Sequence, residues 1–287
     1  MANYKIITDS ACDLPQAMLR KLDVIVTPLY VLYKGQTMPD TVEDGAIKEF
    51  YAGMRAGEVP TTSAVNPEGW AAVMEPVLAA GKDVLVLGFS AGLSTTYQSA
   101  VIAADELREK YPQRKICVVD TASAALGQGL LVYYACKKRD EGLSLEELAA
   151  WVEENKPYLA HWFTVDDLVY LKRGGRVSAA TAVLGTMLQI KPVLHVDEDG
   201  HLVSMVKARG RKASMQTLVS KFEELGEGFD NDIVFICHAD CADEAKVLEQ
   251  MVRQKGVKEV FVGNLGAVIG SHAGPGTLAL FFMSKNR

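Results

Sequence analysis

Two clusters of hydroxyl side chains have the spacing and the surroundings to hold a small anion. Thr61–Ser63 precedes an Asn-Pro turn at residues 66–67, and Ser-Thr-Thr at residues 94–96 stands where a helix is expected to begin. The first amides of a helix lack an intrahelical partner and carry the positive end of its dipole, so hydroxyl donors beside them suit a carboxylate. The same side chains would also serve as plain caps for a helix and a turn, and their spacing leaves both interpretations open.

A different chemistry is indicated by Gly-Phe-Ser-Ala-Gly at residues 88–92, which fits the pattern G-x-S-x-G directly after an apolar strand. In serine hydrolases this turn lifts the nucleophile above an oxyanion hole, and Ser90, an aspartate and His272 follow in a chain order known for that class. The helix must then begin directly behind the serine, whereas here the loop continues through Leu93. A serine hydrolase that uses Ser90 is therefore the alternative function.

Sequence signatures of nucleotide binding are absent. The chain has no G-x-x-x-x-G-K-S/T loop, and the Gly-x-Gly at residues 127–129 lacks the third glycine of a dinucleotide-binding loop. The turn-rich segment 270–276 contains His272 but no lysine that would hold a phosphate. Two basic stretches, one with Arg173 and one with Arg209, would form either a positive rim for a partner or two ordinary solvated surfaces.

The elements that must position these groups alternate between strands and helices in the first half of the chain. Apolar runs predict strands at residues 4–8, 23–30, 83–89 and 115–120. Residues 95–110 predict a helix, and a Ser-Leu-Glu-Glu capping box at residues 144–147 predicts the start of another. Strands separated by helices pair in parallel through right-handed crossovers, so we expect a Rossmann-like, mainly parallel sheet.

The second half of the chain has a different pattern. Two apolar runs flank Asp-Glu-Asp-Gly at residues 197–200, which predicts a hairpin, and a helix is expected at residues 179–189. Antiparallel pairing at the hairpin, together with later strand–helix units, predicts a mixed sheet. The expected fold class is therefore α/β with two domains, residues 1–157 and residues 158–287, divided near a Lys-Pro pair at 156–157.

Composition excludes several classes of protein. The 287 residues include 49% hydrophobic and 23% charged side chains, as in globular proteins, and no apolar run approaches the roughly 18 residues of a membrane span. A net charge of −6 disfavours binding to nucleic acid, which depends on dense Lys and Arg. The five scattered cysteines, and the lack of a basic and apolar leader pattern, lead us to expect a cytoplasmic protein with reduced thiols.

A series of motifs runs in a fixed order through nearly the whole chain. They are Thr-Asp-Ser at residues 8–10, Asp-Leu at 13–14, Thr-Ser at 62–63, Leu-Ser-Thr-Thr-Tyr-Gln-Ser-Ala at 93–100, Val-Asp-Thr at 119–121, Arg-Gly-Gly-Arg at 173–176, Ile-Lys-Pro at 190–192 and Gly-Ser-His-Ala-Gly-Pro-Gly at 270–276. Together they resemble the DegV family of bacterial fatty-acid-binding proteins, and the last motif is the most specific. Thr95 and Thr121 depart from most members, which have glycine and serine there.

The resemblance implies a two-domain α/β protein that holds one long-chain fatty acid in a buried tunnel and has no turnover of its own. In some bacteria such a protein is the lipid-presenting subunit of a fatty acid kinase, whose separate ATP-binding subunit converts the bound acid to an acyl phosphate. Arg173 and Arg209 resemble the family's basic residues implicated in kinase docking or phosphoryl transfer. The implied partners are the fatty acid and the kinase subunit, with no cofactor, no nucleic acid and no integral membrane segment.

The resemblance also assigns the residues that hold the fatty-acid carboxylate. Thr62 and Ser94 match the family's contacts to the head group, with Ser63, Thr95 and His272 beside them. The hydroxyl of Thr95 would either add a donor or crowd the anion. Neutral donors and a helix end would hold a carboxylate without a buried arginine, and we expect neither a catalytic residue nor a metal ligand.

Overall fold

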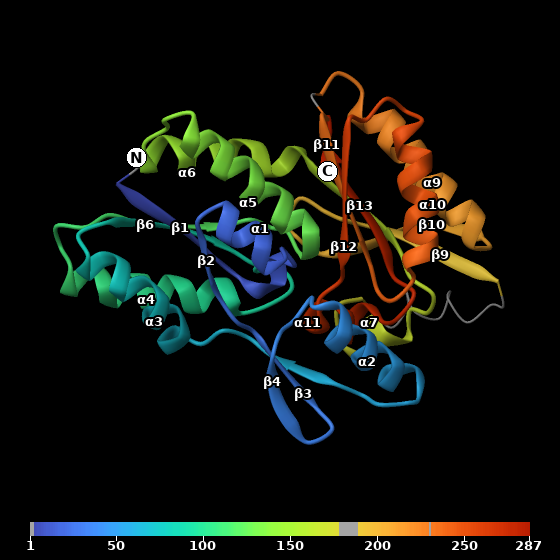
Figure 1. The fold of residues 1–287 in the computed structure, drawn as a ribbon, viewed down its shortest axis with the longest axis horizontal. Helices are drawn as coiled ribbons and strands as arrows, with labels where there is room; N and C mark the ends of the chain where they lie inside the picture. Colours follow the sequence, from blue (N-terminus) through green and yellow to red (C-terminus); the bar gives the residue numbers. More distant parts are fainter. Residues whose placement is uncertain (1–2, 178–188, 230) are drawn as a thin grey trace.

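A four-stranded parallel sheet organises the first half of the chain in a computed structural model that describes residues 3–177, 189–229 and 231–287. Its strands, in the order β2-β1-β6-β7, are β1 (Tyr4–Asp9), β2 (Val24–Thr27), β6 (Asp83–Gly88) and β7 (Ile116–Asp120). One face is covered by α3 (Pro67–Ala79) and α4 (Thr96–Lys110), and the other by α1 (Gln16–Lys21), α5 (Ala125–Asp140) and α6 (Leu145–Asn155) (Figure 1). The predicted parallel sheet is therefore confirmed.

Local sequence explains how these elements form. Strand β6 is buried along nearly its whole length because it is a continuous apolar run with helices on both faces. At the start of α6, the side chains of Ser144 and Glu147 each accept a hydrogen bond from the other residue's backbone amide, which is the predicted capping box. The helix predicted at residues 95–110 begins at Thr96.

A six-stranded mixed sheet organises the second half, in the order β10-β9-β8-β13-β11-β12. Its strands are β8 (Leu159–Thr164), β9 (Ile190–Val196), β10 (Leu202–Arg209), β11 (Ile233–His238), β12 (Glu259–Asn264) and β13 (Leu278–Met283). Strands β11 and β12 pair in parallel, whereas the other neighbours are antiparallel, including the predicted hairpin of β9 and β10. Helices α9 (Arg211–Gly226) and α10 (Ala242–Arg253) cover one face (Figure 1). The predicted mixed sheet is confirmed, and the helix expected at residues 179–189 lies outside the described residues except for its last position.

A small antiparallel sheet, in the order β4-β3-β5, differs from the sequence-based expectation. Its strands are β3 (Tyr30–Tyr33), β4 (Gln36–Pro39) and β5 (Thr61–Ser63). The single strand expected at residues 23–30 ends at Thr27 because Pro28 has no amide to donate to the ladder, and the chain then enters this second sheet. Strand β5 pairs with β3 so that Thr62 stands opposite Val31, which fixes one of the two hydroxyl clusters on a strand.

Helix α5 packs between the two large sheets. It contacts the 3-10 turn η1 (Ser10–Cys12) on one side and β8, β11 and β13 on the other. The approach is so close at Gly127 that a Cβ atom there would lie 2.2 Å from His161 Nε2. The strands of the parallel sheet precede residue 156 and those of the mixed sheet follow it, while the division into domains 1–157 and 158–287 stays a prediction.

Helix α11 (Ala267–Ala273) joins the small sheet to the second half of the chain. It contacts α2 (Asp44–Arg55), α7 (Val169–Arg173), β3 and β5, and these elements lie together beneath the gap between the large sheets in Figure 1. Its first turn is held by Asp40, whose Oδ1 accepts hydrogen bonds from the amides of Val268 and Thr41 at 2.9 and 3.0 Å. Residues far apart in sequence therefore meet at this helix.

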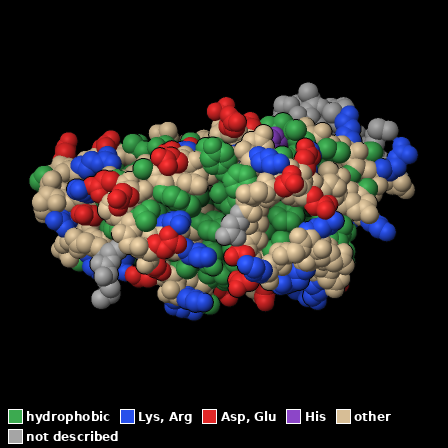
Figure 2. Space-filling model, turned by 90° about the horizontal axis from the view of Figure 1, so that it is seen from above, with side chains coloured by type: hydrophobic (Ala, Val, Ile, Leu, Met, Phe, Trp, Pro, Cys, Tyr) green, Lys and Arg blue, Asp and Glu red, His purple; other side chains and the backbone are tan. Residues whose placement is uncertain are grey.

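The surface carries charges of both signs. Figure 2 shows Lys and Arg side chains intermixed with Asp and Glu on the face seen from above, and hydrophobic side chains gathered near its middle. Among the helices of the described residues, none is both long and apolar enough to cross a membrane.

Candidate binding site

A cavity of about 440 Å³ lies where the two large sheets and the small sheet face one another. Its volume falls within the roughly 300–1,000 Å³ typical of small-molecule sites. The wall is mostly apolar and includes Leu29, Phe89, Phe163, Leu171, Val196 and Phe281. These side chains come from both halves of the chain. Because they expose hydrocarbon to the cavity, the cavity suits an apolar ligand.

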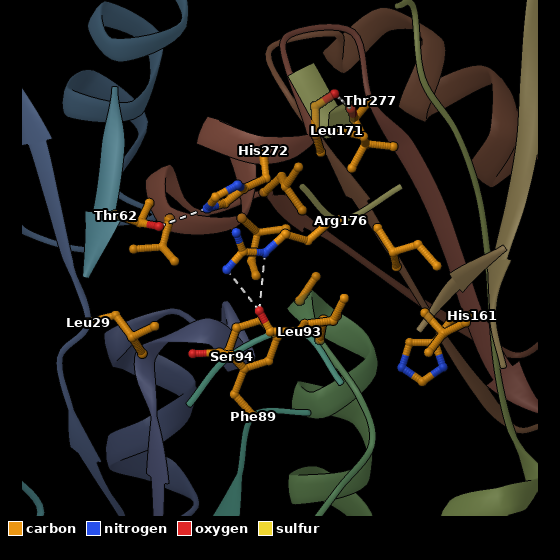
Figure 3. A pocket seen from close by; sticks show the side chains of 18 of the residues that line it. Leu29, Thr62, Phe89, Leu93, Ser94, His161, Leu171, Arg176, His272 and Thr277 are labelled. Carbon is orange, nitrogen blue, oxygen red and sulfur yellow. Dashed lines mark hydrogen bonds between the residues drawn. The ribbon is translucent and has the colours of Figure 1, made fainter. Parts of the chain in front are cut away.

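Hydroxyl groups and a histidine also line this cavity, and Figure 3 shows Thr62, Ser94 and His272 near one another. Thr62 and Ser63 come from β5, Ser94 and Thr95 from the segment just before α4, and His272 from α11. The fold therefore brings into one wall all five residues that the sequence grouped as a carboxylate site.

A hydrogen bond between Thr62 and His272 links β5 to α11 in the wall, with 2.7 Å between Oγ1 and Nε2 (Figure 3). Burial, and then the nearby charge of Arg176, lower the pKa of His272 to about 4, so the ring is neutral at about pH 7. When Nε2 carries the ring proton and donates it to Thr62, the threonine hydroxyl is free to donate into the cavity. The other ring nitrogen is buried without a partner against Gly174, where a Cβ atom would lie 2.2 Å from it.

The hydroxyl of Ser94 is positioned by the first turn of α4. Its Oγ accepts a hydrogen bond from the amide of Thr96 at 3.2 Å and lies 2.9 Å from Oγ1 of Thr96, which is fully buried. When Thr96 is the donor of both bonds, the hydroxyl proton of Ser94 is left for an anion in the cavity. Thr95 stands at the N-cap position of α4, but it is exposed and its side chain makes no cap hydrogen bond.

Arg176 also lines this wall, although the sequence placed it only in a basic stretch with Arg173 and not among the carboxylate contacts. Its Nε and Nη2 donate to the carbonyl of Leu93 at 3.2 and 3.0 Å (Figure 3). Its Nη1 donates to the carbonyl of Gly174. Burial lowers the pKa of Arg176, and its hydrogen bonds go to backbone carbonyls. A half-buried arginine with neutral partners therefore lines the cavity, contrary to our expectation of a site without one.

The Arg-Gly-Gly-Arg motif identified the segment but not which basic residue turns inward. That depends on Gly175, whose φ of 72° lies in the left-handed region that favours glycine. The chain reverses there after α7, and Arg176 crosses to Leu93, a contact that no local pattern in the sequence encodes.

The geometry around Ser90 does not form the nucleophilic turn of a serine hydrolase. The Ser90 side chain is fully buried, and its hydroxyl donates to the carbonyl of Gly200 at 2.9 Å. Helix α4 begins six positions later, at Thr96, rather than directly behind the serine. The histidine of the expected chain order, His272, is hydrogen-bonded to Thr62 instead.

Nearly the whole chain matches a known family. The model of the DegV family, whose members are described as uncharacterised proteins, matches residues 3–285. The chain belongs to the DegV family. A DegV domain-containing protein of Clostridium perfringens is 43% identical to it and covers 100% of this chain and 99% of its own length.

Solved DegV structures share the fold. A DegV family protein from Thermus thermophilus, described for its fatty acid binding, is 37% identical, with a TM-score of 0.88 over 98% of this chain and 99% of its own. A stearic-acid-binding protein from Eubacterium ventriosum is 28% identical, with a TM-score of 0.84 over 98% of each chain. The α/β architecture with a parallel sheet and a mixed sheet is therefore that of DegV proteins.

In this DegV protein, the two arginines expected to meet a kinase lie outside the described cavity wall. Arg173 ends α7, and its guanidinium carbon lies 5.8 Å from the ring centre of Tyr170. Arg209 ends β10, where it stands opposite Ile190. Both arginines are exposed, which suits contact with a partner, and their role stays a prediction.

We expect His272→Gln to make folding less sensitive to acid. The folded chain holds the pKa of His272 at about 4, below the ordinary 6.5, so between about pH 7 and pH 5 the unfolded chain takes up a proton that the folded chain does not. The contribution of His272 to the free energy of unfolding is therefore fully present above the pKa of the unfolded chain. As the pH falls from about 7 to 5, about 1–2 kcal/mol of that contribution is lost. Urea unfolding at the two pH values should show a smaller loss in the variant, whereas equal losses in both proteins would contradict the lowered pKa.

Proposed function

We propose that this protein binds one long-chain fatty acid in the cavity, with the acyl chain against the apolar wall and the carboxylate at Thr62 and Ser94. The observation that carries the proposal is one cavity that combines an apolar wall with hydroxyl donors and a charged arginine. The Thermus thermophilus relative, which is described for fatty acid binding, supports it. The stearic-acid-binding relative from Eubacterium ventriosum supports it as well.

The acyl chain supplies most of the affinity. About 15 methylene groups at roughly 0.8 kcal/mol each give on the order of 12 kcal/mol of gross stabilisation on burial. Losses of translational freedom and ordering of the chain offset several kcal/mol, which leaves tight but reversible binding. The protein then acts as a carrier.

The polar residues fix where the carboxylate sits. The hydroxyls of Thr62 and Ser94 donate to it, and Arg176 supplies the opposite charge while keeping its bonds to backbone carbonyls. Because Ser63 and Thr95 line the cavity and are also exposed, we assign them to its mouth. His272 orients Thr62 from behind as a neutral ring.

We further propose that the bound acid is presented to a separate ATP-dependent kinase subunit, which forms the acyl phosphate, so that this chain has no independent turnover. The exposed Arg173 and Arg209 would dock that subunit or stabilise the developing phosphate charge. Five free cysteines support a reducing, cytoplasmic setting for both proteins.

Removing one hydroxyl at a time tests the carboxylate site. We expect Thr62→Val and Ser94→Ala each to weaken the binding of palmitic acid by about 1 kcal/mol, or roughly fivefold in Kd, because each loses one hydrogen bond. Equilibrium titration measures the Kd. Thr217→Val is the matched control, since the Thr217 hydroxyl bonds to Ala213 within α9, away from the cavity. Unchanged affinity in both site variants would remove these residues from the site, and failure of the wild-type protein to bind palmitic acid would overturn the proposed function.

Replacing the arginine should separate charge from packing. We expect Arg176→Gln to weaken palmitic acid binding by roughly tenfold or more, since hydrogen bonds to charged groups are worth about 1.5–3 kcal/mol. Binding of the matched alcohol, hexadecanol, should change little because it carries no charge. Equal losses for acid and alcohol would show that Arg176 acts only through packing.

Arg209→Ala and Arg173→Ala should leave palmitic acid binding intact, because both side chains are exposed and outside the described wall. Acyl phosphate formation with an added kinase subunit should fall severalfold in both. Lys246→Ala, at another exposed cation on α10, is the control for a general change in surface charge. Loss of palmitic acid binding in either arginine variant would contradict the docking role.

A further inference from the structure

A buried guanidinium joins the two halves of the chain. Arg287 is only 8% exposed. Its three nitrogens donate five hydrogen bonds, as many as a guanidinium has N–H groups. The acceptors are the backbone oxygens of Thr121, Ala122, Leu159 and Asp197 and the hydroxyl of Ser123. Because these acceptors come from distant parts of the chain, Arg287 fixes their positions relative to one another.

The acceptors around Arg287 are four carbonyl groups and one hydroxyl, all of them neutral. Burial lowers the pKa of Arg287 to about 10, and the carboxylates of Asp120, Asp197 and Glu198 act in the opposite direction. The side chain is therefore charged at about pH 7. A buried charge has given up its hydration, so opening of this region would return water to the guanidinium and offset part of the hydrogen bonding that is lost.

The backbone that Arg287 binds in the first half of the chain is strained. Residues 121–124 form the loop between β7 and α5. Ala122 within this loop has a φ of 48°, and Ala125 directly after it has a φ of 54°, both in the left-handed region that is costly for a residue with a Cβ atom. We therefore expect the loop to relax when it is released from its partners.

This loop packs directly on the hairpin turn of the second half, residues 197–200. A Cβ atom on Gly200 would lie 3.2 Å from the Cα of Ala122. Ser90 bonds to both segments, because its amide donates to the carbonyl of Ser123 at 3.0 Å and its hydroxyl donates to the carbonyl of Gly200 at 2.9 Å. We call the contact between this loop and this turn the seam.

The seam reaches from the cavity to the surface. Ala124 ends the loop and Ala125 begins α5, and both line the cavity, as does Val196 directly before the turn. Residues 198 and 199 of the turn are exposed. The residues that we assign to the carboxylate lie in neither the loop nor the turn, so opening of the seam would leave that site intact.

We propose that Arg287 is a latch for ligand exchange: it holds the strained loop against the turn, and a fatty acid enters and leaves the cavity when this seam opens. The inference rests on the proposed function, since it concerns the same cavity. The seam suits opening because water replaces its hydrogen bonds and the loop loses its strain, whereas separating packed apolar side chains costs hydrophobic burial. Arg287 is not among the described residues of the cavity wall, so it acts by positioning the seam.

Rates of ligand exchange test this proposal. The protein is freed of co-purified lipid, association of radiolabelled palmitic acid is followed by rapid filtration, and dissociation is followed by a chase with unlabelled acid. We expect Arg287→Met to raise both rates about tenfold and to change Kd less than twofold, because the latch holds the empty and the loaded cavity shut alike. Arg287→Lys keeps the charge but loses the planar fork, so both rates should rise less.

A second arginine provides the matched control. Arg139 is also largely buried and donates to a backbone carbonyl, that of Leu22, but it lies outside the described cavity wall. Arg139→Met should therefore leave both rates unchanged.

Relief of strain should act in the opposite direction. Ala122→Gly lets residue 122 keep its left-handed φ without a steric cost, so the closed seam is favoured and both rates should fall about threefold. Lys34→Gly is the control, because Lys34 has a φ of 50° but lies in the turn between β3 and β4, outside the described cavity wall, and both rates should stay unchanged. This test stands even where Arg287→Met fails to fold.

Three results would overturn the inference. If palmitic acid binds and Arg287→Met leaves both rates unchanged, or raises the dissociation rate alone, Arg287 is not a latch, while the proposed function stands. Rates that do not fall in Ala122→Gly would show that the strained loop stays closed during exchange. If the wild-type protein binds no palmitic acid, the proposed function fails and the inference fails with it.

Discussion

A carboxylate leaves water only where donors and an opposite charge replace its hydration. The groups that would do so in the proposed site come from three distant parts of the chain: Thr62 on β5, Ser94 ahead of α4, and Arg176 after α7. None of these segments is close to another in sequence, so the parallel sheet, the small sheet and the mixed sheet must all be in place before the site exists. The apolar wall also forms only when both halves of the chain are folded, because its side chains come from both halves.

The ionisable side chains around helix α11 differ in how burial changes their pKa values. His272 is held neutral by burial and by Arg176, so among the described residues that line the cavity the positive charge is that of the Arg176 guanidinium. Helix α11, which carries His272, is held in turn by the carboxylate of Asp40, and Asp13 lies beside it against Gly266. Burial raises the pKa of both carboxyl groups, to about 6 for Asp40 and well above the ordinary value for Asp13.

Local sequence patterns predicted the elements that depend on local forces. The apolar run of β6, the capping box at Ser144 and the hairpin after β9 all form as expected, because each is decided by a few neighbouring residues. The small sheet was missed for two reasons. Strands β3 and β5 pair across about thirty residues of chain, and β3 and β4 are four-residue strands whose tight turn at Lys34 and Gly35 was not recognised. Arg176 was noted as part of a basic stretch, but its inward direction was not predicted, because that direction is set by one left-handed glycine and by the carbonyl of Leu93, far away in sequence. The hydroxyl clusters were found by their chemistry, and their convergence in one cavity required the tertiary fold.

Native mass spectrometry of the purified protein shows whether the cavity holds a fatty acid by its apolar chain and an anchored carboxylate. We expect an added mass equal to one long-chain fatty acid per chain, released as a free acid on denaturation. A protein that is free of ligand, and that gains no mass when palmitic or oleic acid is added, would contradict it.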